Sequence, residues 1–137
     1  MKRDWDLLRK QLSDIEAEID FLSELPICPE WKLNQPREEY EQLLGDFNAN
    51  ESIVFGHLEL LVDNDYVQGI DIRRSVDGMF SYGLHNPRLT MLGHDLLDTM
   101  RSTSIWESIK STAKTKGIEL TFDAIKFLGV DALKRLL

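Results

Sequence analysis

Two residues in the middle of the chain, His57 and Glu59, have the H-x-E spacing with which zinc deaminases supply a metal ligand and a proton-transferring carboxylate. That chemistry also needs a P-C-x-x-C motif, and the single cysteine of the chain, Cys28, lies far upstream. The other histidines, His85 and His94, follow no ligand-pair spacing either. We therefore expect no metal site and no cofactor.

Nucleophilic catalysis has equally little support. Cys28 stands between two prolines without a nearby basic group to stabilise a thiolate. The chain contains neither a phosphate-binding glycine loop nor a G-x-S-x-G elbow. Its many carboxylates form no recognisable catalytic pair. The sequence therefore predicts a protein that is not an enzyme.

The composition is that of one acidic globular domain. The 137 residues include 16 Lys and Arg against 24 Asp and Glu, for a net charge of −8, and 42% are hydrophobic. This length favours a single domain over 1–137. No apolar run approaches the ~18 residues of a membrane span, and the first residues are not a signal peptide. With one cysteine and no expected disulfide, we predict a cytoplasmic protein.

The N-terminal part of the sequence predicts a long helix followed by a loop. Apolar residues three and four positions apart predict a helix over 1–25, capped by Asp4 and ended by Pro26. The stretch PICPEWKLNQP predicts a loop or an extended arm, with Trp31 tucked against the body.

The central part predicts two helices and a β-hairpin. Helices are expected over 37–47 and 51–64, separated by a turn in NANES. Two strands follow on either side of an Asp77–Gly78 turn, because D-G is a strong hairpin signal.

The C-terminal part begins at the junction RLTMLGHDLLDTM. Thr90 is expected to cap a helix there, and Gly93 to let another backbone approach its first turn. Two further helices follow, the first ended by Gly117 and the second capped by Thr121.

This order of elements predicts a mainly α protein with a small β-hairpin, an α+β fold. Three helices, a hairpin and a helix are the connectivity of a winged-helix domain, here placed over 36–102. The long helix over 1–25 would precede this core, and a helical extension over 103–137 would follow it.

Several motifs resemble those of a known family. They are the opening MKRDWDLLRK, the central GHLELL followed by YVQG, the run RLTMLGHDLLD, and an ending with W-x-x-x-K and FDAIK. Together they resemble Domain of Unknown Function 2513, nearly end to end apart from 26–50. Its members are small bacterial and phage or prophage proteins. The resemblance implies a phage or mobile-element setting and no catalytic residues.

A winged helix would normally read DNA with the helix over 51–64, yet this segment has no Lys or Arg. Its carboxylates would repel phosphates, so the charge disfavours nucleic acid as a partner. Arginines near the hairpin could contact a minor groove or pair with local carboxylates. The candidate surface for a partner protein or DNA comprises Ser52, Phe55, His57, Glu59, Asp63, Arg73, Arg74, Asp77 and Arg88.

Two functions are compatible with these features. The first is a non-enzymatic winged-helix protein, encoded by a phage or mobile element, that binds a host or phage protein. Its acidic face would compete for a basic groove and so inhibit or modulate a host nucleic-acid or defence component. The alternative is a dimeric DNA-binding transcriptional regulator.

A homodimer is also expected. The two ends of the chain carry apolar stripes, and the acidic flank of the first helix argues against pairing with its own copy. We therefore expect the terminal helices to pack on each other and to form the contact between two copies. The candidate dimer surface comprises Trp5, Leu8, Leu12, Ile15, Phe122, Ile125, Leu133 and Leu136.

Overall fold

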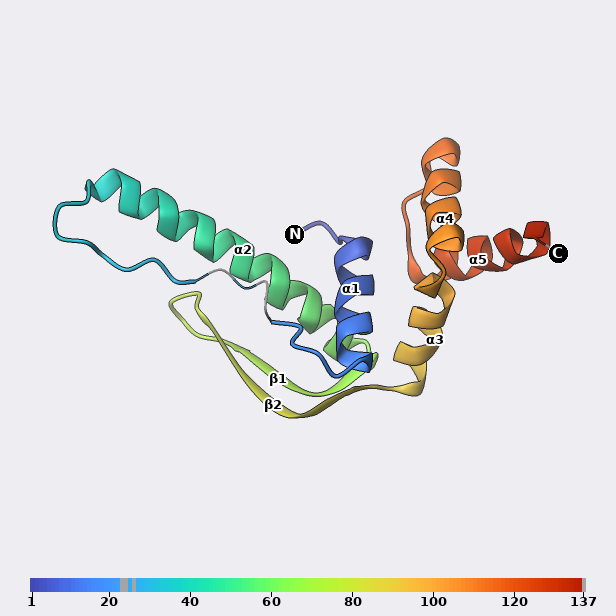
Figure 1. Cartoon of the computed structure of the whole chain (residues 1–137), viewed down its shortest axis with the longest axis horizontal. Helices are drawn as coiled ribbons and strands as arrows, with labels where there is room; N and C mark the ends of the chain where they lie inside the picture. Colours follow the sequence, from blue (N-terminus) through green and yellow to red (C-terminus); the bar gives the residue numbers. More distant parts are fainter. Residues whose placement is uncertain (23–24, 26, 137) are drawn as a thin grey trace.

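The computed structural model describes residues 1–22, 25 and 27–136, apart from the side chain of Leu136. This part of the chain is mainly helical with one antiparallel hairpin, which confirms the expected α+β class (Figure 1). The elements in order are α1 (Trp5–Glu16), α2 (Arg37–Asp63), β1 (Val67–Arg74), β2 (Phe80–Leu89), α3 (Met91–Arg101), α4 (Thr103–Lys116) and α5 (Phe122–Leu136).

α1 begins where expected and ends earlier. The Asp4 side chain caps it by accepting the backbone N–H groups of Asp6 and Leu7 at 3.0 and 3.2 Å, as predicted. The helix then ends at Glu16, so the predicted helix over 1–25 is too long. The expected stop at Pro26, together with 23–24, lies outside the described residues.

A Schellman motif ends α1. Glu18 adopts φ 57°, in the left-handed region, and its N–H donates to Ile15 O at 3.2 Å. The next N–H, from Ile19, donates to Asp14 O at 3.0 Å. Glycine usually occupies the left-handed position of this motif. Because a glutamate stands there instead, the sequence carries no signal for this helix end.

α2 is one continuous helix of 27 residues, so the predicted turn at 48–52 is wrong. That segment contains Asn and Ser but neither Pro nor Gly, and Asn costs only about 0.5 kcal/mol in a helix interior. Phe47 and Phe55, one on each side of the segment, are both buried and stabilise the helix on its inner face. The turn that would separate the second and third helices of the expected winged-helix domain is therefore not formed.

The hairpin pairs Val67 with Leu89 at its base and Arg74 with Phe80 near its tip. The turn lies where Asp77–Gly78 predicted it, in the five residues 75–79 between the strands, with Gly78 at φ 81°. The Gly78 N–H donates to Ser75 O at 3.0 Å, and the Ser75 N–H donates to Met79 O at 2.9 Å.

The junction between β2 and α3 confirms the roles predicted for Thr90 and Gly93. The Thr90 hydroxyl oxygen accepts the Gly93 N–H at 3.1 Å and also donates to Asp65 O. A Cβ on Gly93 would lie 2.0 Å from Tyr66 O, so only glycine lets the start of β1 approach this turn. The same Tyr66 carbonyl accepts the Thr90 N–H at 3.0 Å.

α4 and α5 have the boundaries expected of them. Gly117 ends α4 with φ 67°, and the Thr121 hydroxyl accepts the Ala124 N–H at 3.1 Å at the start of α5. Within the described residues, no helix is both long and apolar enough to cross a membrane.

The core is one cluster that extends from α1 to α5. Leu12, Leu96, Met100, Trp106 and Ile125 are all 0% exposed within it. α1 packs on α2, α3 and β2, whereas α5 packs on α4 and α3. The expected packing of the two terminal helices on each other is therefore not the main contact of either helix.

Candidate functional site

His57, predicted on the partner surface, is instead a buried link between α1 and α2. It is 1% exposed, and its Nε2 accepts the Asp4 N–H at 2.7 Å. Its Nδ1 lies 2.7 Å from Ile53 O and can donate to it. Both ring nitrogens thus lie within hydrogen-bond distance of backbone groups. His57, the histidine of the H-x-E pair, therefore has a structural role.

Phe55 is the second predicted surface residue that is buried, with 3% exposed. Its ring stacks on Phe80 with centroids 5.1 Å apart and lies 5.4 Å from the ring of Tyr82. It therefore attaches the hairpin to α2. Ser52 and Asp63 remain exposed on α2, as expected.

The hairpin arginines are largely paired. Arg74 donates to the Glu59 carboxylate, with Nη2–Oε1 at 2.6 Å and Nε–Oε1 at 3.0 Å. The Arg88 guanidinium donates to Asn86 O at 3.1 Å and to Gln68 Oε1 at 3.2 Å. Of these contacts, the one between Arg74 and Glu59 is the pairing with a local carboxylate that the sequence left open as one of two interpretations.

Arg73 and Asp77 complete the predicted surface. Arg73 is exposed on the outer side of the hairpin, beside Asp71 and His85. Asp77 accepts hydrogen bonds from the Ser75 hydroxyl at 2.6 Å and the Met79 N–H at 3.1 Å. These bonds, the one from Ser75 first, hold the pKa of Asp77 below its usual value. Asp77 thus shapes the hairpin tip.

Half of the residues of the predicted dimer surface are buried inside one chain. Leu8, Leu12, Ile15 and Ile125 are at most 2% exposed, so they are not available to a second copy. Trp5 and Phe122 are half-buried. The exception is Leu133, which is 50% exposed, while the side chain of Leu136 lies outside the described residues. The regular stripe of α1 is thus a core face.

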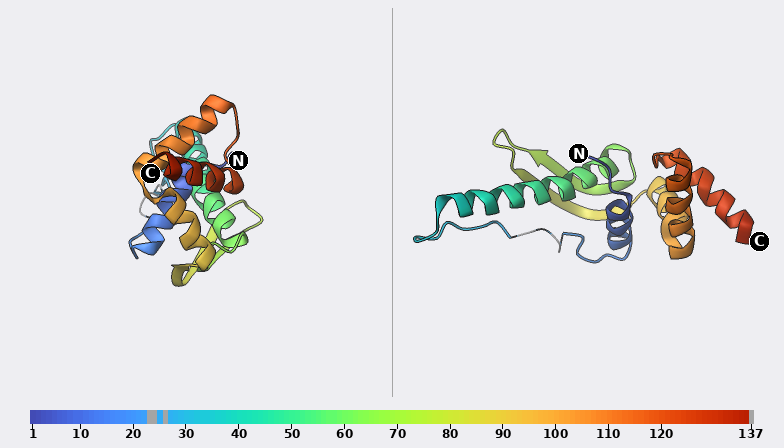
Figure 2. Two further views of the ribbon diagram at one scale, coloured as in Figure 1. Left: turned by 90° about the vertical axis from the view of Figure 1, so that its right-hand side faces the viewer. Right: turned by 90° about the horizontal axis from the view of Figure 1, so that it is seen from above.

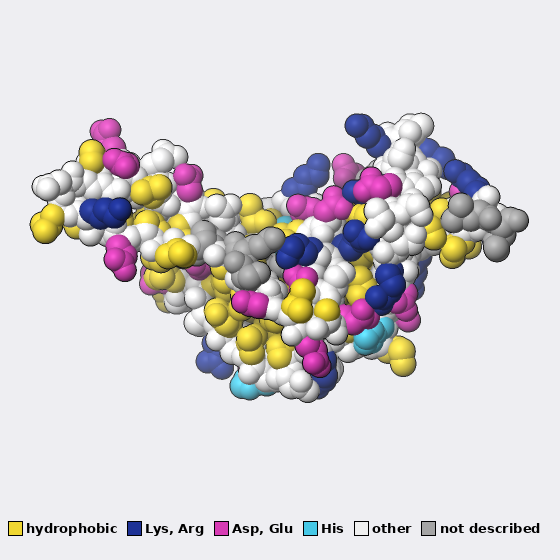
Figure 3. Space-filling model, in the orientation of Figure 1, with side chains coloured by type: hydrophobic (Ala, Val, Ile, Leu, Met, Phe, Trp, Pro, Cys, Tyr) yellow, Lys and Arg dark blue, Asp and Glu magenta, His cyan; other side chains and the backbone are white. Residues whose placement is uncertain are grey.

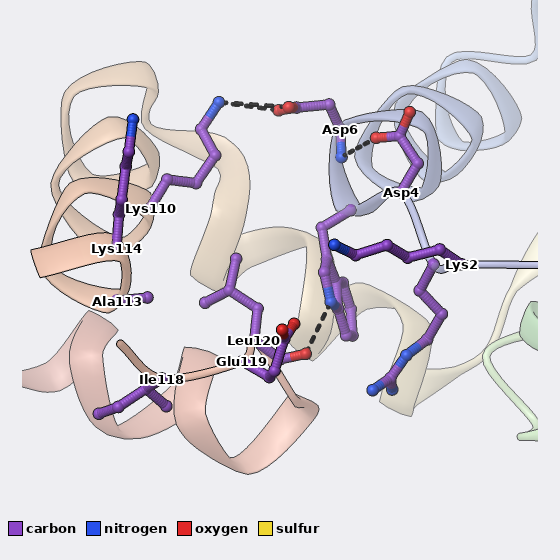
Figure 4. A pocket seen from close by; sticks show the side chains of 11 residues that line it. Lys2, Asp4, Asp6, Lys110, Ala113, Lys114, Ile118, Glu119 and Leu120 are labelled. Atoms are coloured by element: carbon purple, nitrogen blue, oxygen red, sulfur yellow. Dashed lines mark hydrogen bonds and ion pairs between the residues drawn. The ribbon is translucent and has the colours of Figure 1, made fainter. Parts of the chain in front are cut away.

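A cleft of about 680 Å³ lies between the start of α1 and the end of α4 (Figure 4). The N-terminal tail, α1, α4 and the segment between α4 and α5 all contribute to it. Its lining residues are Lys2, Arg3, Asp4, Trp5, Asp6, Lys110, Ala113, Lys114, Ile118, Glu119 and Leu120.

The polar groups of this cleft mainly join the two ends of the chain. Asp6 accepts the indole N–H of Trp106 at 2.8 Å and Lys110 Nζ at 3.0 Å. Burial raises the pKa of Asp6, but the hydrogen bonds from Trp106 and Lys110 outweigh it and keep the pKa below its usual value. The Trp5 indole N–H donates to Leu120 O at 3.0 Å.

These hydrogen bonds and ion pairs limit the chemistry that the cleft can perform. Asp4 caps α1 and Asp6 is paired, so neither carboxylate is placed to act as a general base. Lys2 and Lys114 have no ion-pair partner in the part of the chain that the structure describes. The cleft therefore lies where contacts hold α1 against α4 and the segment after it, and its lining has more positive than negative side chains.

The histidines lie in separate environments. His85 Nε2 lies 3.2 Å from Asp71 Oδ2, and His94 Nδ1 lies 3.4 Å from Glu16 Oε2, while His57 is buried. Among the described residues, no three of the His, Cys, Asp and Glu side chains come together as metal ligands could.

Residues 27–50 form an arm that projects from the body. It consists of the segment 27–36, which runs beside the first half of α2, and residues 37–50 of that helix (Figures 1 and 2). Trp31 contacts the ring of Tyr40 edge-on at 5.1 Å, so the segment is attached to the arm's own helix. The expected packing of Trp31 against the body is wrong, since this side chain is 54% exposed.

The arm exposes apolar side chains in an acidic setting. Ile27 and Leu33 are 93% and 90% exposed, and Leu43 is 44% exposed. Figure 3 shows hydrophobic and acidic side chains side by side at this end. The arm contains five Asp and Glu residues against two Lys and Arg. Sequence reasoning missed this surface because Ile27 and Leu33 lie in a proline-containing segment without helical or strand periodicity.

The molecule is thus a mainly helical α+β protein with a projecting arm. The family described as "Hypothetical protein (DUF2513)" matches residues 2–119, and the chain belongs to this family. A Haemophilus influenzae relative described as "Uncharacterized protein" is 28% identical over 137 residues, covering 100% of this chain and 99% of the relative. No solved structure matches the chain. The family membership expected from the motifs is confirmed.

Proposed function

We propose that this chain is a non-enzymatic protein that binds another protein through its arm. The observation that carries the proposal is the exposure of Ile27, Trp31 and Leu33 on a segment that projects from the body (Figure 2). Exposed apolar side chains grouped on one feature are typical of protein-binding surfaces. An aromatic residue such as Trp31 commonly supplies much of the binding energy at such a surface.

The charge of the arm suggests the kind of partner. Its acidic excess complements a basic surface, such as the groove of a nucleic-acid-binding protein. This charge agrees with the phage or mobile-element setting that the resemblance implies. We therefore propose a host nucleic-acid or defence component as the partner. Binding there would inhibit or modulate that component in the cytoplasm.

A comparative capture experiment tests this function. The wild-type chain, a Trp31→Glu/Leu33→Glu double variant and a Val76→Glu control would each be used as bait in host cells. Val76 is fully exposed at the hairpin tip, so its substitution changes charge and apolarity away from the arm. We expect a protein retained by the wild type and the control and lost by the arm variant. Equal retention by all three baits would contradict the proposal.

The alternative of a dimeric DNA-binding regulator is less well supported. Arg74 is neutralised by Glu59, and α2 carries no basic residue over 51–63. Of the hairpin arginines, Arg73 has the fewest local contacts to lose on meeting a phosphate. A single such contact supplies little of the affinity that DNA-binding proteins need.

A further inference from the structure

α5 has two apolar faces, and its inner face is already used within the chain. That face packs on α4 and α3 through Ile125, Leu128 and Ala132, which are 0%, 4% and 6% exposed. Gly129 allows close packing, because a Cβ there would lie 3.0 Å from Thr99 Cγ2. α5 is therefore held firmly against the body on this side.

The outer face carries a second set of apolar residues. Phe127, Val130 and Leu133 are 71%, 53% and 50% exposed. Phe127 and Val130 lie on the side of the helix opposite Ile125, and Leu133 lies at the edge of that side. Hydrophobic side chains are visible on α5 at this edge of the molecule (Figure 3). Exposed apolar residues grouped on one face of a helix are typical of a surface that binds a partner.

The charges along this outer face identify that partner. Asp123, Phe127, Val130 and Lys134 are spaced by four, three and four residues, so they lie along one line of the helix. The line has an acidic end and a basic end with an apolar middle. Neither Asp123 nor Lys134 has an ion pair within the described chain, whereas the neighbouring Asp131 and Arg135 are paired with each other at 2.6 Å.

We propose that the outer face of α5 binds the same face of a second copy of this chain, with the two helices antiparallel. In this register Asp123 of each copy faces Lys134 of the other, and Phe127 faces Val130. The line is self-complementary only in the antiparallel direction, because parallel helices would place like charges opposite each other. A symmetric contact of this kind closes as a dimer.

The size of the contact predicts a weak association. One 15-residue helix from each copy is about 22 Å long and buries less than the ~1,200 Å² typical of stable complexes. We expect dissociation constants in about the tens of micromolar. This contact differs from the dimer surface predicted from the sequence, and Leu133 of that surface lies at its edge.

Sedimentation equilibrium from micromolar to several hundred micromolar tests the surface. The wild type is expected to pass from monomer to dimer over this range. Val130→Glu is expected to stay monomeric, and Val76→Glu, an apolar-to-acid control at a fully exposed position on the hairpin, is expected to dimerise as the wild type does. A monomeric wild type at the highest concentration, or a Val130→Glu variant that dimerises normally, overturns the proposal. Circular dichroism verifies that Val130→Glu keeps its helices.

Charge reversal tests the register. Asp123→Lys and Lys134→Asp each place like charges at both ends of the contact, so each is expected to weaken dimerisation by about threefold to tenfold. The double variant, and an equimolar mixture of the two single variants, restore opposite charges and should dimerise like the wild type. Single variants that dimerise normally, or a mixture that does not regain association, overturn the antiparallel arrangement.

Discussion

At the scale of single residues, His57 shows how a side chain suited to chemistry serves the fold. It accepts the Asp4 N–H and contacts Ile53 O, so it fixes the start of α1 on α2. His57→Leu leaves these polar groups unpaired in a buried site. We expect a loss of about 1–3 kcal/mol in the free energy of unfolding, measured by chemical denaturation.

His85→Leu is the matched control for this prediction. His85 is largely exposed on the hairpin and contacts Asp71 at 3.2 Å. Its replacement is expected to change the free energy of unfolding by less than ~0.5 kcal/mol. If the two variants unfolded at the same denaturant concentration, the structural role of His57 would be refuted.

Replacement by alanine should change the free energy of unfolding in opposite directions at two glycines. A Cβ on Gly93 would meet Tyr66 O at 2.0 Å, so Gly93→Ala must displace the backbone where the start of β1 approaches α3. We expect it to lower the free energy of unfolding by about 3 kcal/mol. A Cβ on Gly45 would have nothing within 4 Å, so Gly45→Ala should raise the free energy of unfolding by about 0.5–1 kcal/mol.

Thermal denaturation of both variants measures this difference. A Gly93→Ala protein as stable as the wild type would mean that the Tyr66 backbone does not approach α3 as closely as described. A destabilising Gly45→Ala would argue against a continuous α2, because alanine is favoured in a helix interior.

At the scale of elements, α1 and α3 are joined by an ion pair whose effect depends on pH. Arg101 donates to both carboxylate oxygens of Glu16 at 2.8 Å. Hydrogen bonding from Arg101 holds the pKa of Glu16 below its ordinary value of 4.5. The folded state thus favours the charged carboxylate. The stabilisation is complete above the unfolded pKa and is lost as the pH falls through the folded one.

Glu16→Gln tests this pair. The variant should be less stable than the wild type at neutral pH. The difference should begin to shrink as the pH falls below about 4.5, the ordinary pKa of the unfolded carboxyl, and should vanish once the pH lies below the lower pKa of the folded state. Denaturation midpoints measured from pH 7 down to acid conditions give the comparison. A difference that stays constant across this range would show that Glu16 acts by packing alone.

The elements themselves were predictable where their signals are local. The caps at Asp4, Thr90 and Thr121 and the end of α4 at Gly117 follow from side chains that satisfy nearby backbone groups. The end of α1 was not predictable, because Glu18 adopts a conformation that its residue type rarely selects. Such an outcome depends on how a segment packs against the rest of the chain.

The continuity of α2 has a similar origin. Asn48, Asn50 and Ser52 favour turns when considered locally, and they suggest a break. In the structure Phe47 and Phe55 are buried on the same helix, on either side of these residues. Tertiary burial of the two rings therefore outweighs the weak local preference.

At the scale of the whole molecule, the sequence could not distinguish a stripe buried in the monomer from one that faces solvent. The stripes containing Leu12 and Val130 have similar spacing, yet the first is 0% exposed and the second 53%. The difference arises from which helices α1 and α5 meet. The projecting arm was likewise hidden, because projection is a property of the assembled chain.

The distribution of charge over the molecule leads to a prediction about DNA. With α2 lacking basic residues over 51–63 and Arg74 paired with Glu59, we expect no binding of duplex DNA at micromolar protein near physiological salt. Gel-shift or anisotropy measurements check this. Tight binding with a steep salt dependence would favour the regulator alternative, and Arg73→Ala should then reduce the salt slope by about one unit.

The claim that the arm is the binding surface is tested most directly by site-specific photo-crosslinking in host cells. A photoreactive residue at Leu33 reports contacts of the arm, and one at Val76 is the control because both side chains are almost fully exposed. We predict a discrete crosslinked protein from position 33 that is absent from position 76 and is lost when Trp31→Glu is added. No crosslink from position 33, or the same products from both positions, would contradict the proposed function.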